Sequence, residues 1–339
     1  MPTQLCCAQK NAFRRGWPAL RCAGITLLIL AITSQFGFAD PTYPNRPIKL
    51  VVPFAAGGNG DAVARVTGLY MQRVLGSSVV IENRPGAGGL IGTEAVAKAA
   101  PDGYTLCVCS TGPITVAPWT ENMTYRPLQD LIPISLINTN ALVLIVNPKL
   151  EAKTAADVVA LSKASPRGFS YSSVGAAGLV TYSAEVFRVQ TGAHIVGVPY
   201  RGGALATSAV VSGEVQLSFA NMSDAMGQLE AKTIHALAVT TAKRSEFLPN
   251  VPTLVEDKLI QYPIESWNGL FAPAGMDQKI VDTLADLMKN MANDPDVRKT
   301  MAQFGSTLVS NSPEQYMQML KDETAQWEKS LAAIGMKKN

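Results

Sequence analysis

The chain has 339 residues, of which 47% are hydrophobic and 16% are charged, and this composition excludes an intrinsically disordered protein. Its formal net charge is +3, and it contains five cysteines. Residues 1–39 carry four of the basic residues, three of the cysteines and no acidic residue. The remaining 25 basic and 26 acidic residues nearly balance, which argues against nucleic acid or an anionic membrane as the main partner. A remainder of about 300 residues is long enough for two domains.

Residues 1–39 have the layout of a secretory signal peptide. A basic segment ends at Arg21, a short apolar run follows, and Gly37 and Ala39 supply small residues just before Asp40. The alternative is an uncleaved membrane anchor, but the apolar run is shorter than the ~20 residues that a spanning helix needs. We therefore expect cleavage after Ala39 and an exported, periplasmic mature protein.

Short β-rich apolar runs alternate with helical patterns along the mature chain, which indicates βαβ units and parallel sheets. The rhythm restarts near residue 141, so we predict two α/β lobes with a ligand cleft between them. The predicted elements are, in chain order, a strand at 48–53, a helix at 60–75, a strand at 79–82, a helix at 89–99, strands at 104–109 and 141–146, a helix at 154–164, a strand at 169–173, a helix at 178–191, strands at 194–199, 215–220 and 235–240, and helices at 277–293 and from 313 onward.

Two of these helices begin with a capping signal. Thr154 with Asp157, and Ser312 with Gln315, have the spacing of a capping box. The last two helices each carry an apolar stripe, which we expect to face the core rather than a cofactor. The stripe residues are Ile280, Val281, Leu284, Leu287, Met288, Met291, Tyr316, Leu320, Trp327 and Leu331.

No catalytic or nucleotide-binding motif is complete. The glycine runs at 57–60 and 86–89 each lack the last glycine of a dinucleotide fingerprint, because Val63 and Ile91 stand in its place. The sequence contains no P-loop, no G-x-S-x-G nucleophile elbow and no Ser-x-x-Lys motif. We therefore predict a protein that is not an enzyme and that needs no cofactor.

Histidine and cysteine give no metal site either. His194 and His235 lie beside or within predicted strands and lack a metal-ligand spacing, so we expect packed or edge residues. Cys107 and Cys109 share one face of a strand, where their Cα atoms would be nearly 7 Å apart, at the edge of disulfide reach. A C-x-C pair alone is too little for zinc. We predict two small core residues, no disulfide and no metal.

Three glycine-rich loops, at 53–61, 84–89 and 172–178, each leave a strand and enter a helix. Small residues at a helix start leave backbone N–H groups uncovered, with the positive end of the helix dipole behind them. Such a terminus binds anions without a charged side chain. From the residues alone, ordinary tight turns remain an equal alternative. Two such loops that face each other across a cleft would hold a carboxylate.

Other side chains near these loops have expected roles. Asp61 and Arg65 lie four residues apart on a helix and can pair, so Asp61 is interpreted as a structural anchor rather than a catalytic acid. Phe54 and Tyr200 each end a strand and would form apolar walls of the pocket. Arg201 is either a ligand for a second carboxylate or a solvated rim charge.

These loops resemble the Bug (Bordetella uptake gene) family, the extracytoplasmic substrate-binding proteins of tripartite tricarboxylate transporters. The resemblance covers essentially all of 43–335. The matching stretches are 43–48, 52–58 with Asp61, Ala64 and Arg65, 80–89, 95–105, 198–202, 236–240 with Arg244, 248–253, and Trp267 with 272–275.

The resemblance implies a type II-like periplasmic binding protein fold, with two Rossmann-like α/β lobes joined by two crossing segments near 138–142 and 262–268. The first lobe would comprise 40–140 and 265–339, and the second lobe 141–264. It further implies a carboxylate ligand held by backbone amides and ordered water.

The sequence departs from the family pattern in the second lobe. Tyr182 and Ser183 replace a frequent His-Leu pair, and Ala209 and Ala220 each replace a frequent Asp. Ser212 replaces the first glycine of a common Gly-Gly pair. Because this lobe would contact the distal part of the ligand, these changes bear on ligand identity.

We therefore predict a monomeric solute-binding protein that delivers a small organic carboxylate, such as a dicarboxylate, an amino acid or an aromatic acid, to a membrane transporter. One alternative is an orphan binding protein that serves a sensor kinase, and a second is a lyase or isomerase with Asp61 or His194 as base. The predicted ligand-binding residues are Phe54, Ala55, Gly57, Gly58, Asn59, Gly60, Ser110, Thr111, Ser172, Ser173, Gly175, Ala176, Ala177, Tyr200, Arg201 and Asn221, with Asp61 and Arg65 as structural neighbours.

Overall fold

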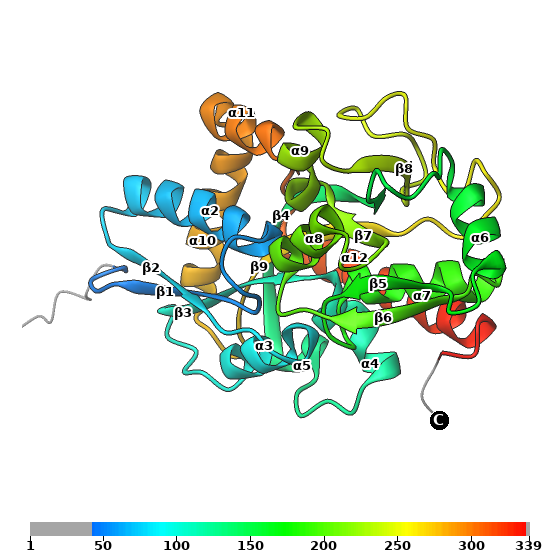
Figure 1. Cartoon of the computed structure of the whole chain (residues 1–339). Helices are drawn as coiled ribbons and strands as arrows, with labels where there is room; N and C mark the ends of the chain where they lie inside the picture. Colours follow the sequence, from blue (N-terminus) through cyan, green and yellow to red (C-terminus); the bar gives the residue numbers. More distant parts are fainter. Residues whose placement is uncertain (1–42, 337–339) are drawn as a thin grey trace, which may run out of the picture. The chain divides into compact units, whose positions relative to one another are not determined.

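The computed structural model describes residues 43–336. Its strands form one continuous mixed sheet in the order β2-β1-β3-β9-β4-β7-β5-β6 (Figure 1). Strands β8 and β10 also pair with β4. The predicted signal peptide lies outside the described residues. The strands are β1 (Ile48–Val52), β2 (Val79–Asn83), β3 (Thr105–Ser110), β4 (Leu131–Val146), β5 (Phe169–Ser173), β6 (Ile195–Pro199), β7 (Leu217–Asn221), β8 (His235–Val239), β9 (Glu265–Pro273) and β10 (Thr307–Leu308).

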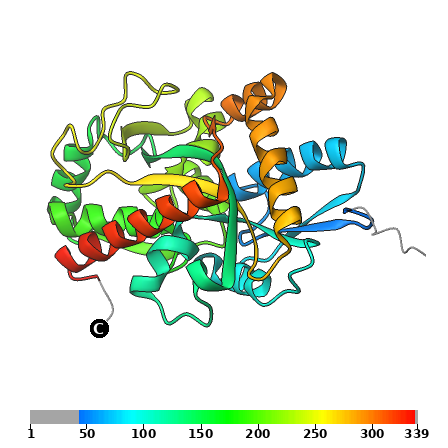
Figure 2. The same ribbon diagram turned by 180° about the vertical axis from the view of Figure 1, so that it is seen from behind.

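Helices cover both faces of this sheet (Figures 1 and 2). They are α2 (Asn59–Leu75), η1 (Ala87–Gly89), α3 (Leu90–Ala97), the π-helical turn η2 (Gly112–Val116), α4 (Ala117–Thr120), α5 (Pro127–Asp130), α6 (Ala155–Ala164), α7 (Leu179–Thr191), α8 (Gly203–Ser212), α9 (Met222–Glu230), α10 (Gln278–Asn293), α11 (Pro295–Gln303) and α12 (Pro313–Ala333). None of the helices within 43–336 is long and apolar enough to cross a membrane.

The long strand β4 joins two α/β halves. Up to Ala141 it pairs with β9, and from Leu142 onward it pairs with β7 and β8. On one side, β1, β2 and β3 run parallel to one another, and on the other side β5, β6 and β7 do the same. This arrangement confirms the predicted two-lobed α/β class. The residue boundaries that we predict for the two lobes stay a prediction.

Each half has its own hydrophobic core. In the first half, β1, β3 and β9 pack against α2 and α10, with Leu50, Met71 and Leu284 fully buried between them. In the second half, Phe187 and Phe219 pack ring to ring with centroids 5.6 Å apart. Helix α12 belongs to both, because its N-terminal half packs in a cluster with Trp267 while Trp327 joins the second core. Figure 2 shows α12 lying across the strands that join the halves.

Local signals in the sequence placed most elements correctly. Both capping boxes are present, with the side chains of Thr154 and Ser312 accepting hydrogen bonds from the third residue of each helix. Sequence reasoning missed α8, α9, α11 and β9, and it shortened β4 to its last six residues. Helix α8 has little amphipathic pattern because its small residues are alike on every face, and that explains why it was missed.

The prediction for the two cysteines is wrong in one respect. Cys107 and Cys109 are fully buried, as expected of small core residues, but they form a disulfide. Their Cα atoms are 5.4 Å apart rather than nearly 7 Å, so β3 is locally shorter than a fully extended strand. The two side chains already share a face, and this contraction brings the sulfurs within bonding distance.

Candidate functional site

The first turns of α2, α7 and α8 surround a cavity of about 50 Å³, which we call the cleft cavity. It is lined by Phe54, Gly58, Asn59, Gly60, Ser110, Thr111, Val174, Gly178, Leu179, Val180, Gly203, Asn221, Asp224, Ser266 and Asn268. A second cavity of about 220 Å³, the glycine-loop cavity, shares Phe54 and Val174 with it. Its other lining residues are Pro85, Gly86, Ala87, Gly88, Gly89, Gly175, Tyr200 and Arg201. The two cavities together occupy the place where we expected the ligand.

The structure brings together most of the predicted site residues, but not all of them. Phe54, Gly58, Asn59, Gly60, Ser110, Thr111 and Asn221 line the cleft cavity, and Gly175, Tyr200 and Arg201 line the glycine-loop cavity. The remaining residues line neither cavity: Ala55, Gly57, Ser172, Ser173, Ala176 and Ala177. Ser172 and Ser173 are buried at the end of β5, while the helix start that reaches the cavity lies further on, at Gly178–Val180.

The helices that begin at the cleft cavity lack a side-chain cap. Gly58, Gly178 and Gly202 occupy the N-cap positions of α2, α7 and α8, and none of them offers a side-chain acceptor. Four other helices, α6, α10, α11 and α12, are capped by Thr154, Asp277, Asp294 and Ser312. The first N–H groups of an uncapped helix need a partner from elsewhere. Three such termini at one cavity direct the positive ends of three helix dipoles and several backbone N–H groups towards it.

Asp61 fixes the loop that precedes α2. Its Oδ2 accepts hydrogen bonds from the Gly57 N–H (2.9 Å) and from Arg65 Nε (2.8 Å), and its Oδ1 accepts from Asn83 Nδ2 (3.0 Å). Burial by itself would raise the pKa of Asp61, but these hydrogen bonds outweigh it and lower the pKa. The Gly57 amide is thus bound within the protein. Asp61 has the contacts of the structural anchor that its spacing from Arg65 suggested.

Sequence reasoning missed Asp224, which lines the cleft cavity from the first turn of α9. Its Oδ1 accepts a hydrogen bond from the backbone N–H of Asn59 (2.8 Å), and its Oδ2 accepts from Asn221 Nδ2 (3.4 Å). Burial raises the pKa of Asp224 to about 6. A methyl group at Gly203 would collide with its Oδ2, so glycine there permits the close approach of α8. The only sequence signal was an acidic residue in a first turn, on a helix that we had not expected.

The two halves touch across the cleft through glycine. A methyl group at Gly88 would lie 2.6 Å from the backbone nitrogen of Gly178, and one at Gly112 would collide with the carbonyl oxygen of Ala177. At Gly202, the added carbon would meet the Cβ of Ala55 at 3.2 Å. The cleft is therefore closed around its cavity in this structure, and a ligand larger than a few water molecules enters only when the halves separate.

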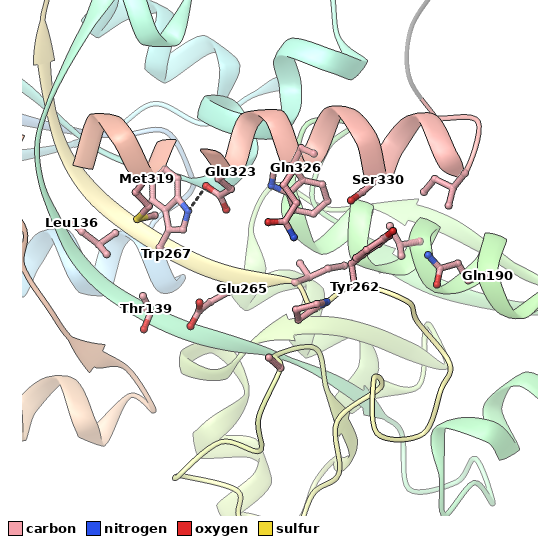
Figure 3. Close-up of a pocket in the computed structure, with 16 residues that line it drawn as sticks. Leu136, Thr139, Gln190, Tyr262, Glu265, Trp267, Met319, Glu323, Gln326 and Ser330 are labelled. Atoms are coloured by element: carbon pink, nitrogen blue, oxygen red, sulfur yellow. Dashed lines mark hydrogen bonds between the residues drawn. The ribbon is translucent and has the colours of Figure 1, made fainter. Parts of the chain in front are cut away.

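A further cavity of about 320 Å³ lies beneath α12 (Figure 3). Two carboxylates line it, Glu323 on α12 and Glu265 on β9. Glu323 Oε2 accepts a hydrogen bond from Trp267 Nε1 at 2.9 Å, drawn as the dashed line in Figure 3. Burial raises the pKa of Glu323 to about 7, and nearby Glu265 contributes to the shift. The residues that line this cavity include no first turn of a helix, so it offers an anion no uncapped helix start.

The bases that we considered for an enzyme lie outside the two cavities or are bound by other residues. His194 and His235 are both exposed, and neither lines the cleft cavity or the glycine-loop cavity. Within 43–336 there is no group of three His, Cys, Asp or Glu side chains that could hold a metal ion. Both oxygens of Asp61 are engaged by Gly57, Arg65 and Asn83.

Residues 63–336 match the family described as tripartite tricarboxylate transporter family receptor. The chain belongs to this family. It is 36% identical to the protein BugT of Bordetella pertussis, over 91% of this chain and 98% of that protein. Its relatives in this family are periplasmic binding and receptor proteins.

Solved structures of family members have the same fold. The periplasmic binding protein BugD superposes with a TM-score of 0.83 at 30% identity, covering 88% of this chain and all of that one. A Rhodopseudomonas palustris protein solved with adipate gives a TM-score of 0.83 at 31% identity, covering 86% of this chain and 98% of the other. This receptor is therefore an extracytoplasmic solute-binding protein by family and by fold.

Proposed function

We propose that this receptor captures a small organic carboxylate in the cleft and delivers it to the membrane subunits of a tripartite tricarboxylate transporter. It does so in the periplasm, after cleavage of the signal peptide, and without a chemical step. The single observation that carries this proposal is the set of uncapped helix starts at Gly58, Gly178 and Gly202 around one cavity. The adipate bound by its R. palustris relative supports a carboxylate ligand.

Some backbone N–H groups near the cavity are already hydrogen-bonded within the protein, and this limits where the carboxylate of the ligand can bind. Within the first loop, the amides of Gly57 and Asn59 are bound by Asp61 and Asp224. We therefore place the carboxylate at the start of α7, where Leu179 and Val180 line the cavity as the first two residues of the helix.

Hydroxyl groups and an aromatic ring complete this site. Ser110 and Thr111 face the same cavity and offer hydroxyls to the ligand or to bridging water. Phe54 borders both cavities, so it would pack against the body of the ligand while Tyr200 closes the glycine-loop side.

The experiment is a thermal-shift screen of the purified protein against mono-, di- and aromatic carboxylic acids and amino acids. We expect at least one acid to raise the melting temperature, because a ligand that binds only the folded state stabilises it. Gly58→Leu should abolish the shift, since the added side chain fills the cleft cavity. Gly227→Leu is the matched control, because no atom lies within 4 Å of its added carbon. A screen in which no acid stabilises the protein would refute the proposal.

A further inference from the structure

Asp224 supplies the only formal charge among the residues that line the cleft cavity. Its two hydrogen-bond donors, the Asn59 backbone and the Asn221 amide, are both neutral. None of the lining residues is Lys, Arg or His. Two basic residues of neighbouring loops and helices have other places: Arg65 pairs with Asp61, and Arg201 lines the glycine-loop cavity. The carboxylate therefore faces the ligand space without a counter-ion from the wall.

Asp224 is half-buried, and a charge withdrawn from water is costly unless it is paired with an opposite one. The raised pKa of Asp224, about 6, reflects that cost, yet the group is still mainly ionised at neutral pH. A ligand that brings its own positive charge to this wall would supply the missing partner. A second carboxylate placed there would instead meet a like charge. A hydroxyl group would offer one hydrogen bond but no charge.

The helix starts explain why a ligand with an ammonium group would also need a carboxylate. Asp224 binds the first N–H of α2, whereas Leu179 and Val180 line the same cavity at the start of a different helix, α7. The lining of the cavity thus includes both a helix start and a carboxylate, contributed by different elements. This pairing of charges matches a zwitterion.

We propose that Asp224 makes this receptor selective for carboxylates that also carry a positively charged amine, as amino acids do. The inference rests on the proposed function and names the substrate class of the same site. Asp224 is thus a specificity-determining residue that contacts the ligand amine. Asp224 is the only acidic residue that the segment after β7 contributes to the lining of the cleft cavity.

The test is calorimetric titration at pH 7.5 with acids that share a skeleton and differ in one group. Propionate, lactate and alanine carry hydrogen, hydroxyl and ammonium at the second carbon, and succinate, malate and aspartate repeat the series with four carbons. Butyrate and 4-aminobutyrate test a longer spacing. We expect the amine-bearing member of at least one series to bind at least tenfold more tightly than its partners.

Asp224→Asn should reduce this preference to threefold or less, while its amide oxygen still accepts the hydrogen bond from Asn59. Glu230→Gln is the matched control, because it makes the same kind of change at an exposed position of the same helix. The control should leave the preference unchanged. The melting temperature of each variant shows whether that variant is folded.

Two results would overturn the inference and leave the proposed function standing. One is that deoxy or hydroxy acids bind as tightly as the amine-bearing acids. The other is that Asp224→Asn retains the full preference for the amine. If no acid of any series binds, the proposed function fails, and this inference fails with it.

Discussion

Asp224 Oδ1 accepts a 2.8 Å hydrogen bond from the backbone N–H of Asn59, although 165 positions separate the two residues. Because Asp224 lies on α9 and Asn59 begins α2, this bond joins the two halves of the molecule. The Asn59 side chain extends the junction, since its Oδ1 accepts hydrogen bonds from Asn140 Nδ2 and Ser223 Oγ. Cleft closure thus depends on a few polar contacts and on glycines that allow close approach.

Gly88→Ala should hold the cleft open. The added methyl group would lie 2.6 Å from the backbone nitrogen of Gly178 in the opposite half. Gly76→Ala is the matched control, because both glycines have a φ of +66° but the methyl group at Gly76 meets no atom within 4 Å. Each variant should lose about 1 kcal/mol of stability from backbone strain. Only Gly88→Ala should also weaken ligand binding, by tenfold or more in calorimetry.

Small-angle X-ray scattering gives an independent reading of the same variant. The radius of gyration of Gly88→Ala at saturating ligand should exceed that of the wild type, and that of Gly76→Ala should not. Equal affinity and equal radius in both variants would show that contact between the glycine loops does not limit closure.

Asp61→Asn should loosen the loop that opens α2. The change removes the ion pair with Arg65 and weakens the hold on the Gly57 amide, at a cost of about 1–3 kcal/mol in the free energy of unfolding. Asp102→Asn breaks an exposed ion pair with Arg46 and should cost less than about 1 kcal/mol. Urea unfolding measures both values. A cost for Asp61→Asn no larger than that of the control would contradict the anchoring role.

The pH dependence of this effect has a definite sign. The pKa of Asp61 is lower in the folded protein, so its stabilisation is present above the pKa of the unfolded chain and is lost as the pH falls through the folded value. The stability difference between wild type and Asp61→Asn should therefore shrink below about pH 4. A difference that grows on acidification would contradict the lowered pKa.

The opposite sign applies to Glu323. Its folded pKa is raised from 4.5 to about 7, mainly by burial, so the contribution of Glu323 to stability is highest at low pH and falls as the pH rises from about 4.5 to about 7. The full shift corresponds to about 3 kcal/mol. Glu323→Gln should flatten this part of the stability curve while keeping an acceptor for Trp267. Asp322→Asn, at an exposed position of the same helix, should leave the slope unchanged.

Much of the fold could be predicted because its signals are local. Periodicity and local sequence signals located α2, α6, α10 and the start of α12 within one or two residues. The glycine loops indicated the region of the candidate site for the same reason, since a helix start after a strand is a local pattern. Helix α8 escaped because its run of small residues has no polar face.

The rest of the site depends on contacts between distant segments. Asp224 reaches the candidate site only because α9 contacts the start of α2 in the folded protein. No spacing in the sequence predicts this contact. Ser172 and Ser173 were predicted to bind the ligand through their hydroxyl groups, but both are buried in the protein interior at the end of β5. The disulfide was missed because ideal strand geometry overstated the distance between its two Cα atoms.

The Cys107–Cys109 disulfide predicts the number of free thiols in the mature protein. Of the residues after the predicted signal peptide, these are the only cysteines, so the mature protein should show no free thiol in denaturant without reductant. After reduction it should show two. Labelling with a maleimide followed by intact mass measurement distinguishes the states. Two labelled thiols in the unreduced, denatured protein would contradict the disulfide.

The most direct test of the proposed carboxylate site is a crystal structure with the acid that gives the largest thermal shift. A carboxylate held by helix starts should have an oxygen 2.7–3.2 Å from the backbone nitrogen of Leu179 or Val180, with Phe54 against the ligand body. A ligand found instead in the cavity beneath α12, or a carboxylate bound by Arg201 with no backbone N–H in contact, would contradict it.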